Sequence, residues 1–164
     1  MKLFEIPNSV AGAVRAAGAL GASMVTVHAM GGTGIMSAAV EAAREFPRLR
    51  VLALTVVTSM TGSDLADIGV AADTEEQVLR LARLAVGAGC DGVIASPREA
   101  GVLRELLGPD RLIVTPGVVL EPEGAAGGHA RPGSRGLPSR PAPRTSWWAG
   151  RSPGRRTRWP RCGR

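Results

Sequence analysis

Apolar residues occur along the chain in two alternating patterns, which predict strands and helices in turn. Short runs such as residues 24–28 and 50–57 are apolar on both faces, as in a parallel sheet covered by helices. Longer segments with apolar residues at helical spacing separate these runs. The predicted strands are residues 1–6, 24–28, 50–57, 91–95 and 111–114. The first predicted helix ends near residue 20, and the other predicted helices are residues 35–46, 62–68, 74–88 and 97–107.

Turn and cap residues set the expected ends of these elements. Asn8 and Ser9 are suited to cap the first helix, and Gly21 is suited to end it. Pro47 should stop the second helix, because proline cannot continue the backbone hydrogen-bond ladder.

Alternation of strand and helix predicts the α/β class with a parallel sheet, either open and doubly wound or closed as a barrel. A closed barrel of this class has eight strands and typically about 250 residues. The sequence supplies about five strands in 164 residues. The barrel interpretation is therefore a partial (β/α)8 TIM barrel of about five βα units.

Charge divides the chain into two unlike parts. Residues 1–128 carry 10 Lys and Arg against 14 Asp and Glu, whereas residues 129–164 carry 10 Arg and no acid. The second part also holds all three Trp and six of the twelve Pro. We therefore expect a folded domain over residues 1–120 and a disordered, basic, Arg/Pro/Gly-rich tail over residues 121–164.

Two interpretations of the tail remain open. Arg with interleaved Trp is suited to bind phosphates and stack on bases, as in an RNA-binding arm. Alternatively, the tail is a frameshifted reading of GC-rich coding DNA, which yields the Arg, Pro, Gly, Ser and Trp found here. The second interpretation is preferred, and nucleic acid is not the expected partner.

Other bulk features narrow the class of protein. The two cysteines, Cys90 and Cys162, have no spacing typical of a disulfide framework or a metal site. No apolar run approaches the roughly 18 residues needed to span a bilayer, and no signal peptide is evident. The sequence predicts a cytoplasmic protein with no metal and no membrane partner.

Polar residues at the predicted strand ends are the candidates for chemistry, because the carboxyl ends of parallel strands face the active site. Lys2 and Glu5 end the first strand, His28 the second and Thr58 the third. Each alone has a structural alternative: a solvated salt bridge, a hydrogen-bonded histidine, or a turn residue. Gly117 ends the last strand in Thr-Pro-Gly, which also suits a turn.

Five segments taken together are more specific than any one residue. They read Lys-Leu-Phe-Glu-Ile-Pro-Asn-Ser-Val, Val-His-Ala-Met-Gly-Gly, Leu-Thr-Val-Val-Thr-Ser-Met, Gly-Cys-Asp-Gly-Val-Ile-Ala-Ser and Leu-Ile-Val-Thr-Pro-Gly. In order and spacing this series resembles the orotidine 5′-phosphate decarboxylase family over about residues 1–117. The resemblance implies a β/α barrel that converts OMP to UMP in pyrimidine biosynthesis without a cofactor, as a homodimer with shared active sites.

The resemblance also implies roles for individual residues. Lys2 matches the family's catalytic lysine, the proton donor to C6 of the uracil ring, and Glu5 stands where the family has an aspartate contributed across the dimer interface. The remaining matches are expected to bind substrate, and they are Ile6, Pro7, Asn8, Ser9, His28, Thr58 and Gly117.

Departures from the family pattern are equally specific. Glu5 is one methylene longer than the family aspartate. The family's aspartate two residues before the lysine, its second lysine and its phosphate-binding Gly-Arg strand have no match in the sequence. We therefore expect this chain to be inactive by itself. A decarboxylase of the 3-keto-gulonate-6-phosphate type remains an alternative, since that group shares an acid-x-Lys-x-x-acid core.

Overall fold

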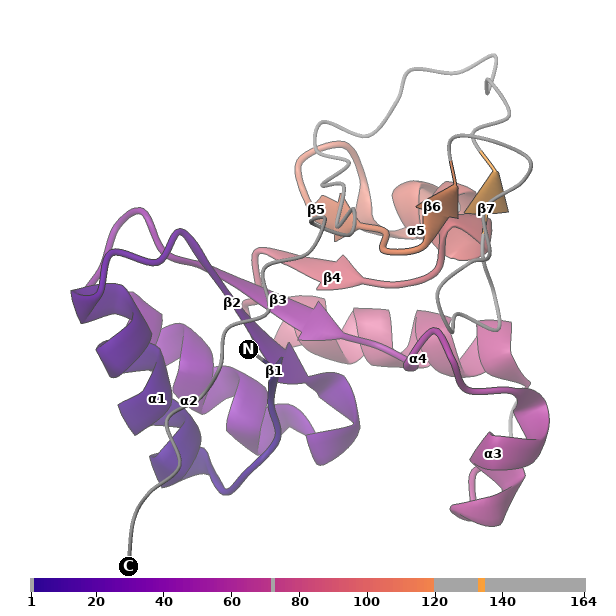
Figure 1. Cartoon of the computed structure of the whole chain (residues 1–164), viewed down its shortest axis with the longest axis horizontal. Coiled ribbons are helices and arrows are strands. Elements are labelled where there is room, and N and C mark those ends of the chain that lie inside the picture. The colour runs from indigo at the N-terminus through magenta and orange to yellow at the C-terminus, as the bar shows by residue number, and fades with distance from the viewer. Residues whose placement is uncertain (1, 72, 120–132, 135–164) are drawn as a thin grey trace, which may run out of the picture.

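A five-stranded parallel sheet forms the centre of the molecule. The computed structural model describes residues 2–71, 73–119 and 133–134. Neighbouring strands pair in parallel in the order β1-β2-β3-β4-β5 (Figure 1). This confirms the predicted α/β class and the number of strands. The strands are β1 (Lys2–Leu3), β2 (Met24–His28), β3 (Arg50–Leu54), β4 (Gly92–Ile94) and β5 (Leu112–Val114).

Helices connect successive strands and give each parallel pair its crossover. Between β3 and β4 two helices follow one another, and between β4 and β5 a single turn of 3-10 helix leads directly into an α-helix. The helices are α1 (Pro7–Ala19), η1 (Ala29–Gly31), α2 (Thr33–Ala43), α3 (Gly62–Asp67), α4 (Thr74–Gly87), η2 (Pro97–Glu99) and α5 (Ala100–Leu107). None of these described helices is both long and apolar enough to cross a membrane.

The expected cap of the first helix is wrong. Helix α1 begins at Pro7, its N-cap residue is Ile6, and no side chain caps it, so Asn8 and Ser9 lie within the helix. Proline favours the first helical position because its fixed φ suits a helix and its missing N–H would have had no partner there. Proline thus determined the start of the helix in place of the cap-forming residues behind it.

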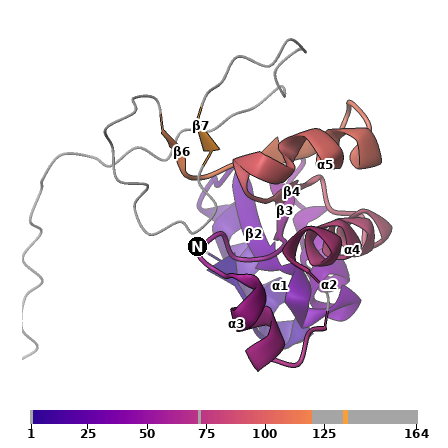
Figure 2. The ribbon, with the colours of Figure 1, turned by 90° about the vertical axis from the view of Figure 1, so that its right-hand side faces the viewer.

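One face of the sheet packs against helices and carries the main core. The helices α1, α2, α4 and α5 are arranged around the sheet as shown in Figures 1 and 2. Alternate strand residues, such as Val27 and Val93, join residues of these helices in a single apolar cluster. Met36 of α2 and Leu103 of α5 are completely buried there. Burying side chains of this size stabilises a fold by about 2–3 kcal/mol each.

The opposite face of the sheet carries a smaller, separate cluster. Leu52, Leu54 and Ile94 form its buried centre, with four partly buried residues around them that include Leu112 and Val114. No residue of a described helix belongs to this second cluster. Because side chains alternate along a strand, Lys2 and His28 point to this same face.

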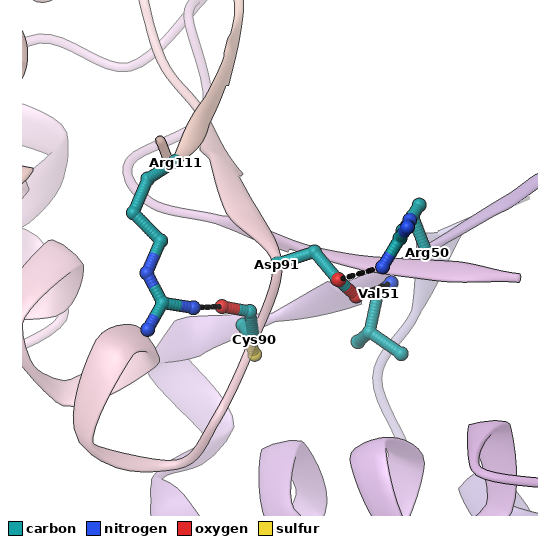
Figure 3. A network of polar contacts seen from close by, with 5 residues as sticks. All are labelled: Arg50, Val51, Cys90, Asp91 and Arg111. Atoms are coloured by element: carbon teal, nitrogen blue, oxygen red, sulfur yellow. Dashed lines mark hydrogen bonds and ion pairs between the residues drawn. The ribbon is translucent and has the colours of Figure 1, made fainter. Parts of the chain in front are cut away.

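At the amino ends of the strands, polar groups are closely paired (Figure 3). Asp91 precedes β4 and accepts hydrogen bonds from the Arg50 guanidinium at 2.9 Å and from the Val51 backbone N–H at 2.8 Å. The Arg111 guanidinium donates to the Cys90 carbonyl at 2.7 Å. Burial, with the nearby Asp91 charge, raises the pKa of the Cys90 thiol to about 11, so the thiol is un-ionised at neutral pH.

Beyond β5 the chain turns at Gly117, whose φ of 77° is one that a residue with a side chain rarely adopts. A two-residue strand β6 (Val118–Val119) follows and pairs in parallel with β7 (Gly133–Ser134). This pair lies partly within the predicted tail and had not been expected. The rest of the segment 121–164 lies outside the described residues, so the domain boundary at residue 120 stays a prediction.

Candidate active site

The register of β1 and β2 brings two of the predicted site residues onto one face of the sheet. Lys2 is directly opposite Thr26, and Leu3 is opposite Val27. Continuing this register places Phe4 beside His28, and their ring centroids are 5.0 Å apart with the planes tilted by 31°. Lys2 and His28 therefore belong to one cluster, at the carboxyl end of the two strands.

His28 is held in an environment that disfavours its charged form. Its Nδ1 atom is buried and has no hydrogen-bond partner among the residues that the structure describes. Burial of the ring, followed by the positive charge of Lys2, lowers the pKa of His28 below its ordinary value of 6.5. At neutral pH the imidazole is therefore uncharged.

Glu5 does not pair with Lys2. One carboxylate oxygen of Glu5 accepts a hydrogen bond of 2.9 Å from the next residue's own backbone N–H, that of Ile6. Among the described residues no ion pair joins Lys2 and Glu5, although the sequence had suggested one. The carboxylate is instead directed toward the amino end of α1, where the helix dipole favours negative charge.

An open pocket of about 390 Å³ lies at the carboxyl ends of β1 and β2. It is lined by Phe4, Glu5, Ile6, Pro7, Gly31 and Ile35. Phe4 and Ile6 expose 61% and 63% of their surface, which is unusual for apolar residues of this size. A Cβ added at Gly31 would meet the end of the Ile35 side chain first and then the Phe4 ring at 2.8 Å, so a larger residue there would have to displace both pocket-lining side chains.

Buried polar residues gather at the carboxyl ends of β3, β4 and β5. They are Thr55, Thr58, Ser96, Glu99 and Thr115, each at most 6% exposed. The Thr55 hydroxyl donates to the Ile94 carbonyl at 2.9 Å and so links β3 to β4. Glu99 accepts from the Ser96 backbone N–H at 2.8 Å and closes a capping box around η2.

The predicted site residues are thus only partly brought together. Lys2 lies on β1 and His28 on the neighbouring β2, whereas Glu5 follows β1 and Thr58 follows β3. Pro7, Asn8 and Ser9 form the exposed first turn of α1. Gly117 follows β5, at the opposite edge of the sheet from β1. Among the described residues, no group of three or more side chains is placed to hold a metal ion.

Two features at the carboxyl ends of the strands were not predicted from the sequence. Phe4 contacts His28 and lines the pocket, and the alternation of side chains along β1 places it on the face of Lys2. The capping box of η2 has the Ser-x-x-Glu spacing of Ser96 and Glu99, which is visible in the sequence. Both signals were present in the printed sequence.

Comparison with known proteins identifies the group to which this arrangement is similar. Residues 1–136 match the model of the orotidine 5′-phosphate decarboxylase / HUMPS family. An orotidine 5′-phosphate decarboxylase of Anaeromyxobacter sp. (strain K) is 50% identical over 128 residues, which are 78% of this chain and 55% of that protein. The enzyme of the same name from Geobacter sulfurreducens is 49% identical over 122 residues, 72% of this chain and 51% of that protein.

Two solved structures are also similar to this chain. The crystal structure of orotidine 5′-phosphate decarboxylase from Lactobacillus acidophilus superposes with a TM-score of 0.69 at 36% identity, over 73% of this chain and 56% of that one. An uncharacterized conserved protein from Geobacillus kaustophilus superposes with a TM-score of 0.67 at 36% identity, over 70% of this chain and 56% of that one. The chain spans about half the length of the relatives it matches. Its five parallel strands, of which β1 to β4 are each followed by a described helix, form part of a barrel.

Proposed function

The chain belongs to the orotidine 5′-phosphate decarboxylase / HUMPS family, and on this premise we propose that it carries the proton-donating part of an OMP decarboxylase active site. The observation that carries the proposal is the cluster of Lys2, Phe4 and His28 on one face of two neighbouring strands, at their carboxyl ends. Active sites of β/α barrels lie at this end.

Lys2 is the proposed catalytic acid. In the reaction the bond between C6 of the pyrimidine and its carboxylate breaks, CO2 leaves, and the electron pair remains on C6. The ammonium of Lys2 stabilises this carbanion by its charge and then protonates it, which gives UMP. The chemistry uses no metal and no cofactor. Uncharged His28 suits this role of Lys2, because it adds no second positive charge next to the donor.

Glu5 is the proposed counterpart of the family aspartate, in a less favourable position. Its carboxylate is bound to the Ile6 N–H and not to Lys2. A carboxylate near the substrate carboxylate would disfavour the ground state of the reaction. An error of about 1 Å in the place of a reacting group can slow a reaction a hundredfold.

The exposed segment after β1 is the proposed contact across a homodimer. Phe4 and Ile6 expose most of their apolar surface, and Pro7, Asn8 and Ser9 continue the exposed stretch. An exposed apolar patch next to a site is typical of a surface that binds a partner. In this proposal Ile6, Pro7, Asn8 and Ser9 contact the substrate bound by the partner subunit.

The remaining proposed contacts come from three other strand ends. His28 and Thr58 are proposed to face the base, and Gly117 leaves room for substrate at the far edge of the sheet. The proposed setting is the cytoplasm, where the nucleotide substrate is found. A 3-keto-gulonate-6-phosphate type of decarboxylase is the second candidate, but the similar curated proteins named above favour the first.

A chimera tests the proposal, because the chain spans about half of its relatives. Residues 2–119 would replace the matching part of the Anaeromyxobacter sp. (strain K) enzyme, to which the chain is 50% identical. Loss of absorbance of OMP is followed, and turnover above the background of the assay is expected. The 164-residue chain alone is the control and is expected to give none. A correctly folded chimera that binds UMP but does not decarboxylate OMP would contradict the proposal.

A further inference from the structure

The regular alternation of side chains in β3 ends at Thr55, the residue directly after the strand. Within β3, Ala53 belongs to the main core and Leu54 to the smaller cluster on the opposite face of the sheet. Continued alternation would place Val56 in the smaller cluster and Val57 in the main core. The structure has the reverse, because Val56 is buried in the main core and Val57 packs against the smaller cluster. Strand pairing therefore does not set the directions of the residues after Thr55.

Thr55 is fastened to the neighbouring strand β4 by two hydrogen bonds to one atom. Its backbone N–H donates to the Ile94 carbonyl oxygen at 3.1 Å, and its hydroxyl donates to the same oxygen at 2.9 Å. A carbonyl oxygen has two lone pairs, so Thr55 uses the whole capacity of this acceptor. Thr55 is completely buried, where water does not compete for these bonds. Only the hydroxyl bond depends on which amino acid stands at position 55.

Thr58, one of the proposed substrate contacts, lies in a tight turn three residues further along the chain. The Met60 N–H donates to the Val57 carbonyl at 2.9 Å, which makes Thr58 the second residue of a four-residue turn. Thr58 is only 5% exposed. On the far side of the turn, Thr61 starts α3 with a capping box. On the near side, the chain is fixed to the sheet by Thr55.

We propose that Thr55 is a positioning residue of the site. Its hydroxyl, bound to the Ile94 carbonyl, fixes the point where the chain leaves the sheet, and so it holds Thr58 where Thr58 can contact the base of the substrate. Thr55 acts through Thr58 and has no contact of its own with the substrate. The inference rests on the proposed function, in which Thr58 faces the base.

Two substitutions separate the hydroxyl of Thr55 from the shape of its side chain. Thr55→Val keeps the branched shape and removes the hydroxyl bond, while the Ile94 carbonyl keeps the backbone N–H as its donor. No buried polar group is left without a partner by this change, so the variant is expected to fold. Thr55→Ser keeps the hydroxyl and loses only a methyl group. It should therefore behave like the unmodified protein.

Hydrogen exchange on the 164-residue chain tests the anchoring without any ligand. NMR measures the exchange of the Met60 amide, whose bond to the Val57 carbonyl closes the turn. We expect Thr55→Val to speed this exchange about fivefold, and Thr55→Ser to change it less than about twofold. The Leu52 amide in β3 is the internal reference and should change much less than the Met60 amide. An equal change at Leu52 would show a general loss of stability and would overturn the proposal.

Steady-state kinetics in the chimera described above test whether the anchoring serves the site. A contact with the base acts on the bound substrate and on the transition state alike, so its loss raises KM and leaves kcat nearly unchanged. We expect Thr58→Val to raise KM for OMP about tenfold and Thr55→Val about fivefold, with kcat within about twofold in both. Thr55→Ser should keep KM within about twofold of the unmodified chimera.

A double variant distinguishes positioning from a general structural role. If Thr55 acts through Thr58, Thr55→Val should have no further effect on KM once Thr58→Val has removed the contact with the base. A residue that only stabilises the fold would instead have the same effect on KM in both backgrounds. Equal effects of Thr55→Val with and without Thr58→Val would therefore overturn the proposal.

The two experiments separate a failure of the inference from a failure of the proposed function. Unchanged exchange of the Met60 amide in Thr55→Val would reject the anchoring, whatever the chimera does. A raised KM in Thr58→Val but not in Thr55→Val would reject the positioning alone. An unchanged KM in Thr58→Val would reject the proposed contact of Thr58 with the base, and the inference with it. A folded chimera without turnover would count against the proposed function, while the Met60 exchange still decides the anchoring.

A third substitution serves if Thr55→Val does not fold. The added methyl group cannot stand as close to the Ile94 carbonyl oxygen as the hydroxyl does, so the valine side chain has to shift. Thr55→Ala removes the hydroxyl and adds no group. It then replaces Thr55→Val in each comparison, with the same expected results and the same outcomes that would reject the proposal.

Discussion

The two ends of the parallel sheet differ in how their polar groups are used. At the amino ends, Asp91 accepts from Arg50 and from the Val51 N–H, and Arg111 donates to the Cys90 carbonyl. At the carboxyl ends of β1 and β2, the His28 Nδ1 has no described partner, and Phe4 and Ile6 expose apolar surface. Satisfied polar groups fix neighbouring strands to one another, whereas exposed apolar side chains that line a pocket, such as Phe4 and Ile6, are available for a ligand or a partner.

This difference explains why the residues expected to stabilise the sheet lie at the amino ends of its strands, whereas the residues proposed for catalysis lie at the carboxyl ends. A carboxylate bridging two strands stabilises the sheet only while both partners stay in place, so the amino end tolerates little change. At the carboxyl end of β2, the described residues offer no hydrogen-bond partner to the His28 Nδ1, and Phe4 and Ile6 stay exposed, so this end contributes less to the stability of the sheet. Substitutions at the two ends should therefore separate into effects on stability and effects on activity.

The largest effect is expected for Lys2→Ala at the carboxyl end, tested in the chimera described above. Removing the ammonium removes both the charge and the proton, so kcat for OMP should fall about a thousandfold or more. Stability should change by less than about 0.5 kcal/mol, because Lys2 is exposed. Steady-state kinetics and urea denaturation measure the two effects. A variant that keeps a tenth of the activity would contradict the assignment of Lys2.

Gly92→Ala at the amino end should have the largest effect on stability. A Cβ at Gly92 would fall on the backbone carbonyl oxygen of Leu112 in the neighbouring strand, and neither backbone can move freely. We expect a loss of about 3 kcal/mol. Gly12→Ala in α1 is the matched control, since a Cβ there meets nothing within 4 Å. That change should stabilise the chain by about 0.5 kcal/mol or more.

The thermal midpoints of both glycine variants measure the difference. If Gly92→Ala and Gly12→Ala have equal midpoints, β4 and β5 are not packed as closely as the structure shows.

Asp91→Ala should have an intermediate effect at the same end. It leaves the Val51 N–H and the Arg50 guanidinium without their acceptor, and the Asp91 side chain is only 29% exposed. We expect a loss of about 2 kcal/mol, measured by urea denaturation. Asp91→Asn keeps one acceptor oxygen and should lose less. Equal losses in the two variants would show that the charge of Asp91, and not its hydrogen bond to the Val51 N–H, links β4 to β3.

The smallest effect is expected for Glu5→Asp in the chimera. The shorter side chain is less able to fold back onto the Ile6 N–H, and its carboxylate can stand where the family aspartate is found. We expect kcat to increase about tenfold, because such displacements affect rates strongly. Glu5→Gln is the control and should not increase kcat. Unchanged kinetics in Glu5→Asp would mean that Glu5 already serves the reaction.

The sequence by itself determined the order of elements and the parallel class of the sheet. Apolar runs on both faces identified β2 and β3, and proline and glycine marked most of the ends. The candidate site residues at the strand ends could also be predicted, because five short segments together resemble one family. The exact start of α1 was not, since Asn8 and Ser9 compete with Pro7 and only the backbone shows which prevails.

The tertiary structure decided how those residues meet. Register between β1 and β2 put Phe4 against the His28 ring and left the His28 Nδ1 without a described partner. The Glu5 carboxylate accepts from the N–H of Ile6, its neighbour in the chain, and makes no described ion pair with Lys2. No local pattern encodes the contact between Phe4 and His28, because strand pairing across the sheet sets the distance between these two residues.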